Sequence, residues 1–345
     1  MSATADVWPA LPLAPWRDTY ATLHMWSQIV GKTRLALAPM ENHWWNVPLY
    51  LTSRGLTTTP MPHGERTFSV YFDFLNHELN IRVSDGGFRS IPLRARSVAD
   101  FYGEYMGALG ALGLPVKMLA RPVEVETAIP FARDEEHRSY DPDAAQRWWR
   151  ATAAADQVFK RFRGRFQGKA SPVHFFWGSF DLATTRFSGR PAPRHPGGAP
   201  NCADWVMVEA YTRECASAGF WPGSDALPEP AFYAYAYPEP PGYAGAAVRP
   251  EGAYYHRDLH EFILPYEVVR TADSPDSVLL EFLQAAQRDA LVVGTKSDRL
   301  SGNGRAQALK TLRAAYGERV LLVSAKTGAG MKELWGEIQR TADSE

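Results

Sequence analysis

Residues 67–74, TFSVYFDF, carry an apolar side chain at every even-numbered position. Side chains of a β-strand alternate between its two faces, so this pattern predicts a strand with one buried face. The segment at 79–83, LNIRV, repeats the alternation after a short turn, and FRSIPL at 88–93 follows an Asp-Gly-Gly turn. Short turns between alternating segments are typical of antiparallel hairpins. Any fold for this chain must therefore accommodate an antiparallel sheet.

Helical patterns flank these strands. Apolar residues recur at helical spacing over 17–30 and 97–112, and Gly31 is expected to end the first of these helices. The pair Asp141-Pro142 predicts the start of a long helix, because proline suits a first helical turn. The other expected elements are strands at 34–39, 43–53, 174–185, 231–237 and 261–266, and helices at 203–217 and 276–287.

The expected elements follow one order twice. A helix, antiparallel strands and a second helix span residues 1–130, and the same order recurs over 131–286, where 231–237 pairs with 67–74. We predict an α+β domain over 1–286, built by a degenerate tandem duplication of these two halves. The alternative is that two unrelated runs of α+β elements match by chance.

From residue 287 the pattern changes to a strict alternation of strand and helix. Apolar strands at 290–294 and 319–323 alternate with amphipathic helices at 305–316 and 330–339. This β-α-β-α order is typical of a parallel, doubly wound sheet. We therefore predict that 287–345 forms a separate, partial α/β segment.

The stretches VVGTKSDRLSGNG and VLLVSAKTGAGMKELWGEI carry a specific resemblance. Residues 290–340 resemble the last part of a P-loop GTPase of the EngB/YihA/YsxC ribosome-biogenesis group. The resemblance implies that Asp298 accepts two hydrogen bonds from guanine and that Lys296 lies along the plane of the base. The other residues that it assigns to guanine recognition are Thr295, Ser324, Ala325 and Lys326.

A GTPase also needs a phosphate-binding loop, Gly-x-x-x-x-Gly-Lys-Ser/Thr, placed between a strand and a helix. The candidate at 26–33, WSQIVGKT, has Trp26 in place of the first glycine and lies within a predicted helix. We therefore expect the guanine-reading motif to be a remnant without a working phosphate site. A gene fusion of neighbouring reading frames would place the guanine-reading motif behind the large domain. The alternative is that the C-terminal segment is part of a real architecture, in which it serves as a packing module.

Residues 7–285 resemble an uncharacterised bacterial family, a domain of unknown function. The segments LHMWSQIVGKTRLALAP, NHWWNVPLY and AFYAYAYPEPPG carry this resemblance. It implies a bacterial protein and brings no known activity. The chemistry of this domain must therefore be inferred from its residues.

Four polar residues form the candidate catalytic site of the large domain. His174, Asp181 and Arg186 supply a base, a carboxylate and a cation from neighbouring segments, and His256 comes from YYHRDLHEF. Active sites gather such groups in clefts, so we expect these four to converge on one cavity between the halves. The alternative is an Asp181–Arg186 ion pair on a strand that buries its aromatic residues.

Two further sets of residues have alternative interpretations. His256, His260 and Glu261 are residue types that bind metal ions. The two histidines, however, have no third ligand at a matching spacing, so no metal is predicted. A set of aromatic residues would stack on a planar ligand if exposed, and would form core if buried. This set comprises Trp44, Trp45, Trp177, Tyr233, Tyr235 and Tyr237.

Composition limits the classes of partner. The formal net charge of -1, from 37 basic and 38 acidic residues, provides no basic surplus for nucleic acid. The sequence shows neither a secretion signal nor an apolar run of membrane-spanning length, so we expect a cytoplasmic protein without a membrane partner or cofactor. Three functions remain open: a small-molecule binding protein or enzyme, a GTP-binding protein related to ribosome assembly, and a noncatalytic interaction protein.

Overall fold

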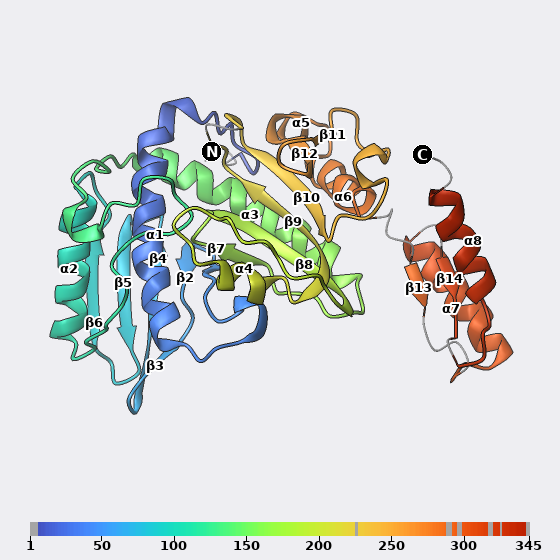
Figure 1. Cartoon of the computed structure of the whole chain (residues 1–345). Helices are drawn as coiled ribbons and strands as arrows, with labels where there is room; N and C mark the ends of the chain where they lie inside the picture. Colours follow the sequence, from blue (N-terminus) through green and yellow to red (C-terminus); the bar gives the residue numbers. More distant parts are fainter. Residues whose placement is uncertain are drawn as a thin grey trace.

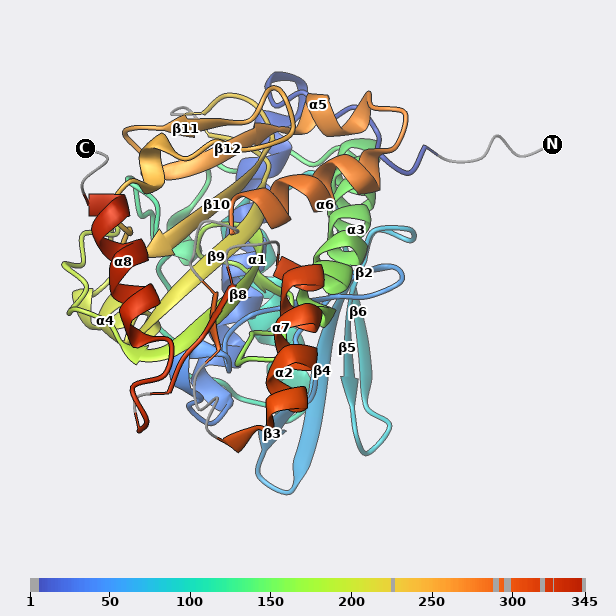
Figure 2. The ribbon, with the colours of Figure 1, turned by 90° about the vertical axis from the view of Figure 1, so that its right-hand side faces the viewer.

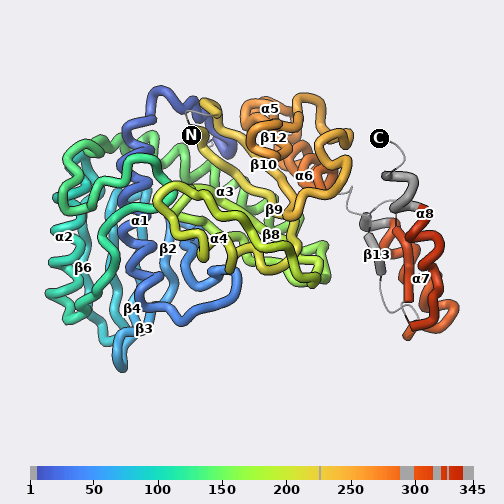
Figure 3. The backbone as a smooth tube through the Cα atoms, in the orientation of Figure 1, coloured from blue at the N-terminus to red at the C-terminus, as the bar shows by residue number. Residues whose placement is uncertain are grey.

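The computed structural model describes residues 6–224, 227–287, 292–294, 299–316, 320–324 and 326–342. Figure 1 shows two antiparallel sheets with helices against them, followed by a small C-terminal group of elements. The chain completes the first sheet and its helices before it enters the second sheet, as the trace in Figure 3 shows. The α+β class expected from the sequence is confirmed.

The first half contains two helices and a six-stranded sheet. Its elements are α1 (Arg17–Leu37), β1 (Tyr50–Leu51), β2 (Gly55–Thr57), β3 (Met61–His63), β4 (Arg66–Asp73), β5 (Glu78–Val83), β6 (Phe88–Pro92) and α2 (Val98–Ala111). The strand order is β1-β2-β4-β5-β6, with β3 also paired to β4. The even-numbered apolar residues of β4 are buried, as their alternation predicts.

The second half repeats the order of helix, antiparallel sheet and helix. Its elements are α3 (Pro142–Gly164), β7 (His174–Phe176), β8 (Asp181–Pro191), α4 (Asp204–Ala210), β9 (Arg213–Trp221), β10 (Ala231–Tyr237), β11 (Tyr254–His256), β12 (Glu261–Pro265), α5 (Tyr266–Arg270) and α6 (Pro275–Ala285). The strand order is β7-β8-β9-β10-β12-β11. As expected, α3 begins at Pro142, where the Asp141 side chain accepts hydrogen bonds from two backbone N–H groups.

The two sheets meet edge to edge. Leu49, next to β1, and Phe175, in β7, exchange two backbone hydrogen bonds of 2.9 Å each. Counted outward from this junction, β9 takes the position of β4, and β10 takes the position of β5. The matching of 67–74 with 231–237 is therefore displaced by one strand, although the order of elements does recur.

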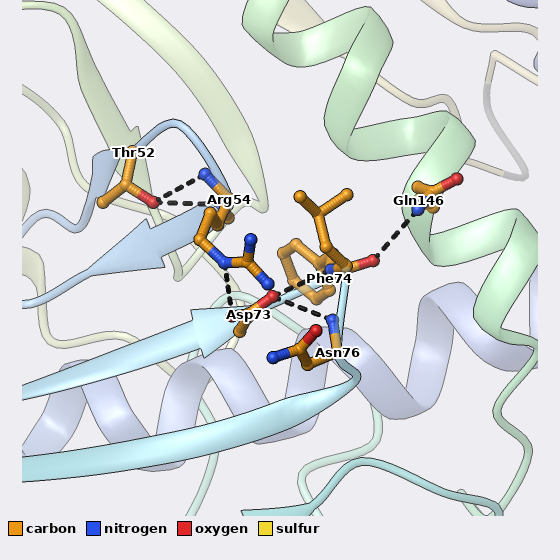
Figure 4. Close-up of polar contacts among 8 residues, drawn as sticks. Thr52, Arg54, Asp73, Phe74, Asn76 and Gln146 are labelled. Carbon is orange, nitrogen blue, oxygen red and sulfur yellow. Dashed lines mark hydrogen bonds and ion pairs between the residues drawn. The ribbon is translucent and has the colours of Figure 1, made fainter. Parts of the chain in front are cut away.

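Helix α3 connects the two halves. Figure 2 shows α3 beside α6 along one side of the second sheet, and the Phe159 ring of α3 packs against Phe232 of β10. At its other end, α3 reaches the first sheet through Gln146, which donates a hydrogen bond to the Phe74 carbonyl (Figure 4). Beside this contact, Asp73 accepts a hydrogen bond from the Arg54 guanidinium at 2.6 Å.

Some local predictions are wrong. Helix α1 continues to Leu37, over most of the segment 34–39 where a strand was expected, and Gly31 lies inside the helix instead of ending it. The segment at 174–185 forms two strands joined by a turn. The helix expected over 203–217 is limited to α4, because the following residues form β9 in the middle of the second sheet. In each case tertiary packing overrides the local pattern.

The C-terminal elements follow the predicted β-α-β-α order. They are β13 (Val292–Gly294), α7 (Gly302–Tyr316), β14 (Val320–Leu322) and α8 (Met331–Ala342). The two strands pair in parallel, as this order requires. The segment thus has the local architecture of a fragment of an α/β domain.

Candidate functional site

A cavity of about 1210 Å³ lies against one face of the second sheet. Both halves contribute to its wall: the first through the C-terminal part of α1, residues 43–47 and residues 117–124, and the second through β7 to β12. The segment 195–211, which contains α4, also lines the cavity, and Figure 1 shows α4 over this sheet. The cavity thus has wall residues from both halves.

Small residues of β9 make room for the tyrosines of β10. Gly219 of β9 pairs with Tyr233, and a Cβ atom at this glycine would lie 2.2 Å from the Tyr233 ring. The ring therefore lies flat over the glycine, and its hydroxyl donates a hydrogen bond to Asp181 two strands away. On the same face, Tyr235 lies opposite Ser217, and its hydroxyl is 2.6 Å from that of Tyr211.

Two carboxyl groups lie along this face, the buried Asp181 and the half-buried Glu261. Asp181 accepts hydrogen bonds from Tyr233 and from the Ser179 hydroxyl, the latter at 2.5 Å. Burial raises the pKa of Asp181 above its usual range. Glu261 of β12 also lines the cavity, and burial, followed by repulsion from Asp181, raises its pKa to about 8. Both groups thus favour the protonated form more than an exposed carboxyl group does.

Glu124 reaches the cavity from the loop after α2. Its backbone has a φ of 57°, and its N–H donates a hydrogen bond to the Pro200 carbonyl at 2.8 Å. Its carboxyl group lies against Gly178, where a Cβ atom would be 2.1 Å from Oε1. The residue is exposed toward the cavity space, and desolvation by the nearby wall, together with Asp181, raises the pKa of Glu124 above its usual value.

Lys32 is a buried cationic residue in the cavity wall. The residue is 3% exposed, and its ammonium group lies 5.6 Å from the centre of the Trp177 ring. Within the described residues, this ammonium group has no hydrogen-bond or ion-pair partner. Burial lowers its pKa from the usual lysine value. Sequence reasoning considered Lys32 only as part of a phosphate loop and missed this position.

His174 is fully buried, at 0% exposure, and lines the cavity. Within the described residues neither of its ring nitrogens has a hydrogen-bond partner. The rings of Trp45, Tyr50 and Phe176 surround it in edge-on contacts. Burial lowers the pKa of His174 to about 3, so the ring is neutral at physiological pH.

The structure brings two of the four predicted catalytic residues to the cavity: His174 and Asp181. Arg186 lies on the opposite face of β8, because successive residues of a strand alternate between its two faces. Its guanidinium group stacks on the Phe162 ring and donates a hydrogen bond to the Phe162 carbonyl. His256 is in β11 opposite Glu261, outside the cavity wall, and its Nδ1 accepts a hydrogen bond from the Leu259 N–H. A catalytic role for any of the four stays a prediction.

All six residues of the aromatic set lie in the cavity wall. They differ in how exposed their side chains are. Trp177 is buried and donates from its indole N–H to the Val47 carbonyl, whereas Trp44 and the three tyrosines of β10 are half-buried. Trp45 is likewise half-buried. These residues therefore serve as cavity lining and as core at the same time.

The histidines near Glu261 are not gathered around a metal position. His260 pairs with Glu239 at 3.4 Å, while His256 belongs to the neighbouring strand. Over the described part of the chain, no group of three His, Cys, Asp or Glu side chains is arranged to hold a metal ion. Over that same part, no helix combines the length and the apolar character needed to cross a membrane.

Most of the predicted guanine-reading residues lie outside the described residues: Thr295, Lys296, Asp298 and Ala325. Ser324 is buried, and its carbonyl accepts a hydrogen bond from the Gly328 N–H in the turn that contains Lys326. The Gly31-Lys32-Thr33 sequence lies inside α1, where the Thr33 hydroxyl bonds to the Ile29 carbonyl and to Tyr105. This geometry is unlike a phosphate loop, which precedes a helix.

Comparison with known proteins gives two matches. The model of a family described as "Family of unknown function (DUF5996)" matches residues 8–298. Over 68 residues, the sequence is 63% identical to the "Probable GTP-binding protein EngB" of Acidobacterium capsulatum, which covers 19% of this chain and 32% of that protein. The chain thus spans about a third of the length of that relative. Both resemblances expected from the sequence are confirmed, and no solved structure matches.

Proposed function

The chain belongs to the family of unknown function DUF5996, and we propose that its large domain binds a small organic molecule in the cavity against the second sheet. The observation that carries this proposal is the cavity of about 1210 Å³, whose wall includes His174 with two buried ring nitrogens that lack partners among the described residues. Ligand pockets combine a mostly apolar wall with a few polar groups, and they often form between structural units. An interaction protein with a flat surface does not need such a cavity.

The polar groups support binding because they are costly in an empty protein. A buried amine or imidazole without a hydrogen bond destabilises the fold, since it has lost water and gained no partner. Both ring nitrogens of His174 are in this position, and the Lys32 ammonium has no ion-pair partner among the described residues. A ligand with matching groups would satisfy them and recover that free energy on binding.

A cavity-filling substitution tests the proposal. Cys202 lines the cavity from the loop before α4, so Cys202→Trp should occupy part of the space. In a thermal-shift screen of small molecules, a ligand at about 100 times its Kd adds roughly 2.7 kcal/mol to the free energy of unfolding. We expect compounds that raise the Tm of the wild type by about 2–4 °C to leave the Tm of Cys202→Trp unchanged.

The matched control is Ser90→Trp, on the exposed part of β6, which should respond to the same compounds as the wild type does. Equal thermal shifts in the wild type and in Cys202→Trp would show that the compounds bind elsewhere. Native mass spectrometry of the purified chain gives a second readout, because a retained molecule should be lost from Cys202→Trp alone.

A second candidate function is guanine-nucleotide binding by the C-terminal segment, which the 63% identity to an EngB protein favours. Phosphate and Mg²⁺ contacts supply most of the affinity of such proteins, and Gly31-Lys32-Thr33 lies inside a helix. We expect a titration with fluorescent GDP to show no saturation below the millimolar range. Micromolar binding that is lost in Asp298→Ala would contradict this expectation.

A further inference from the structure

The charged groups of the cavity wall are separated along the sheet. Lys32 lies over Trp177, which directly follows β7, whereas Glu261 belongs to β12. The order β7-β8-β9-β10-β12 places four strand spacings between these positions. Neighbouring strands are about 4.8 Å apart, so the backbones at the two ends are separated by roughly 19 Å. The long side chains of lysine and glutamate shorten the distance between the charges themselves.

The Lys32 end of the cavity suits an anionic group. The Lys32 ammonium is buried and, among the described residues, has no ion-pair partner. Glu124 lies near enough for Lys32 to lower its pKa, yet the two form no ion pair. In its protonated form, Glu124 can donate a hydrogen bond to the same anionic group. A ligand carboxylate between an ammonium group and a carboxylic acid accepts a charge-assisted hydrogen bond from each of them.

The Glu261 end suits a cation. In the described part of the chain, the Glu261 carboxyl group has no hydrogen-bond or ion-pair partner, and Tyr235 of the neighbouring strand β10 lines the same cavity. Asp181 adds a second carboxyl group between the two ends, where it accepts hydrogen bonds from Ser179 and Tyr233. Carboxylates and aromatic faces together favour an ammonium group. Between the ends, the wall consists largely of aromatic rings, which favour an apolar or planar body.

We infer that the ligand of this cavity is an extended zwitterion, with a carboxylate at Lys32, an ammonium group at Glu261 and an apolar body between them, as in a short peptide with free termini. The inference rests on the proposed small-molecule function. A purely anionic ligand would leave the Glu261 carboxyl group without a partner, and a purely cationic ligand would leave Lys32 unpaired. A peptide of about four residues spans roughly 13 Å in extended form, which suits the separation of the two ends.

The probe is the tetrapeptide Phe-Gly-Gly-Phe in three forms: free, N-acetylated and C-amidated. We expect calorimetry on the full chain to show that the free peptide binds at least about tenfold more tightly than either blocked form, because each block removes one buried charge contact. Lys32→Met should abolish the preference for the carboxylate over the amide. Glu261→Gln should abolish the preference for the free amine over the acetyl group.

The matched controls are Lys310→Met and Glu135→Gln, which change exposed residues outside the cavity wall and should keep both preferences. The Tm of each variant verifies that it is folded. Preferences that survive both Lys32→Met and Glu261→Gln, or no binding of the free peptide at millimolar concentration, would overturn the inference. The cavity itself would still be a binding site in that case if Cys202→Trp suppresses the thermal shifts of other compounds.

Discussion

Replacing Gly31 with alanine is expected to lower the free energy of unfolding by roughly 2–3 kcal/mol, the range for overpacking a filled core. The added Cβ atom would lie 2.3 Å from the Trp177 indole, so that ring would have to move. The Trp177 ring is buried, donates a hydrogen bond of 2.8 Å to the Val47 carbonyl and underlies the Lys32 ammonium. Urea-induced unfolding of the wild type and the variant measures the difference.

The control is a second helical glycine that has free space around it. Gly107 of α2 is exposed, and an added Cβ atom would meet nothing within 4 Å. Gly107→Ala should therefore raise the free energy of unfolding by about 0.5–1 kcal/mol, because alanine loses less backbone entropy in a helix. The same substitution thus has opposite signs at the two positions. An equal effect at both would show that Gly31 has no special packing role.

The substitution Glu261→Gln is expected to stabilise the protein at high pH but not at low pH. The folded pKa of about 8 lies above the ordinary value of 4.5, so the folded state binds more protons than the unfolded state between these values. The free energy of unfolding of the wild type therefore falls as pH rises through this window. Glutamine cannot ionise and lacks this loss. Allowing for screening by water in the cavity, we expect a gain of about 1–3 kcal/mol at pH 9 and almost none near pH 4.

The measurement is the difference in unfolding free energy between Glu261→Gln and the wild type, taken from pH 4 to pH 9. Asp181 and Glu124 also titrate, but they are present in both proteins and largely cancel in the difference. Glu135→Gln, at an exposed position outside the cavity, is the matched control. A flat difference for Glu261→Gln would mean that its carboxyl group titrates as an exposed group does.

Strands with a strong periodic pattern of apolar residues were predicted correctly from the sequence. A strand composed largely of small residues was not. The alternation in 67–74 and 231–237 identified β4 and β10, because each buries one face. Strand β9 was missed since its cavity face carries Cys215, Ser217 and Gly219, which lack the size and branching typical of strands. These residues are small because the tyrosine rings of β10 lie over them, and this relation exists only in the folded protein.

Only part of the candidate site was predicted from the sequence, because some of its contacts exist only in the folded protein. His174 and Asp181 stood out as polar residues within an apolar segment, and the cavity contains both. Lys32 and Glu124 come from a helix and a loop of the other half, and only the tertiary fold brings them to the second sheet. An isolated glycine in a helical pattern, such as Gly31, was the available signal for close packing at α1.

The hydrogen-bonded pair of Leu49 and Phe175 has a consequence for the origin of the molecule. An edge strand that is left open readily pairs with another chain. The exchange of two antiparallel bonds at this junction is the contact that two identical edges would make around a two-fold axis. If the halves descend from one ancestral unit, that unit had the means to form a homodimer, and joining two copies in tandem turned a subunit interface into the interior of one chain. The two copies could then diverge, so that one supplied the sheet on one side of the cavity and the other the helix that also lines it.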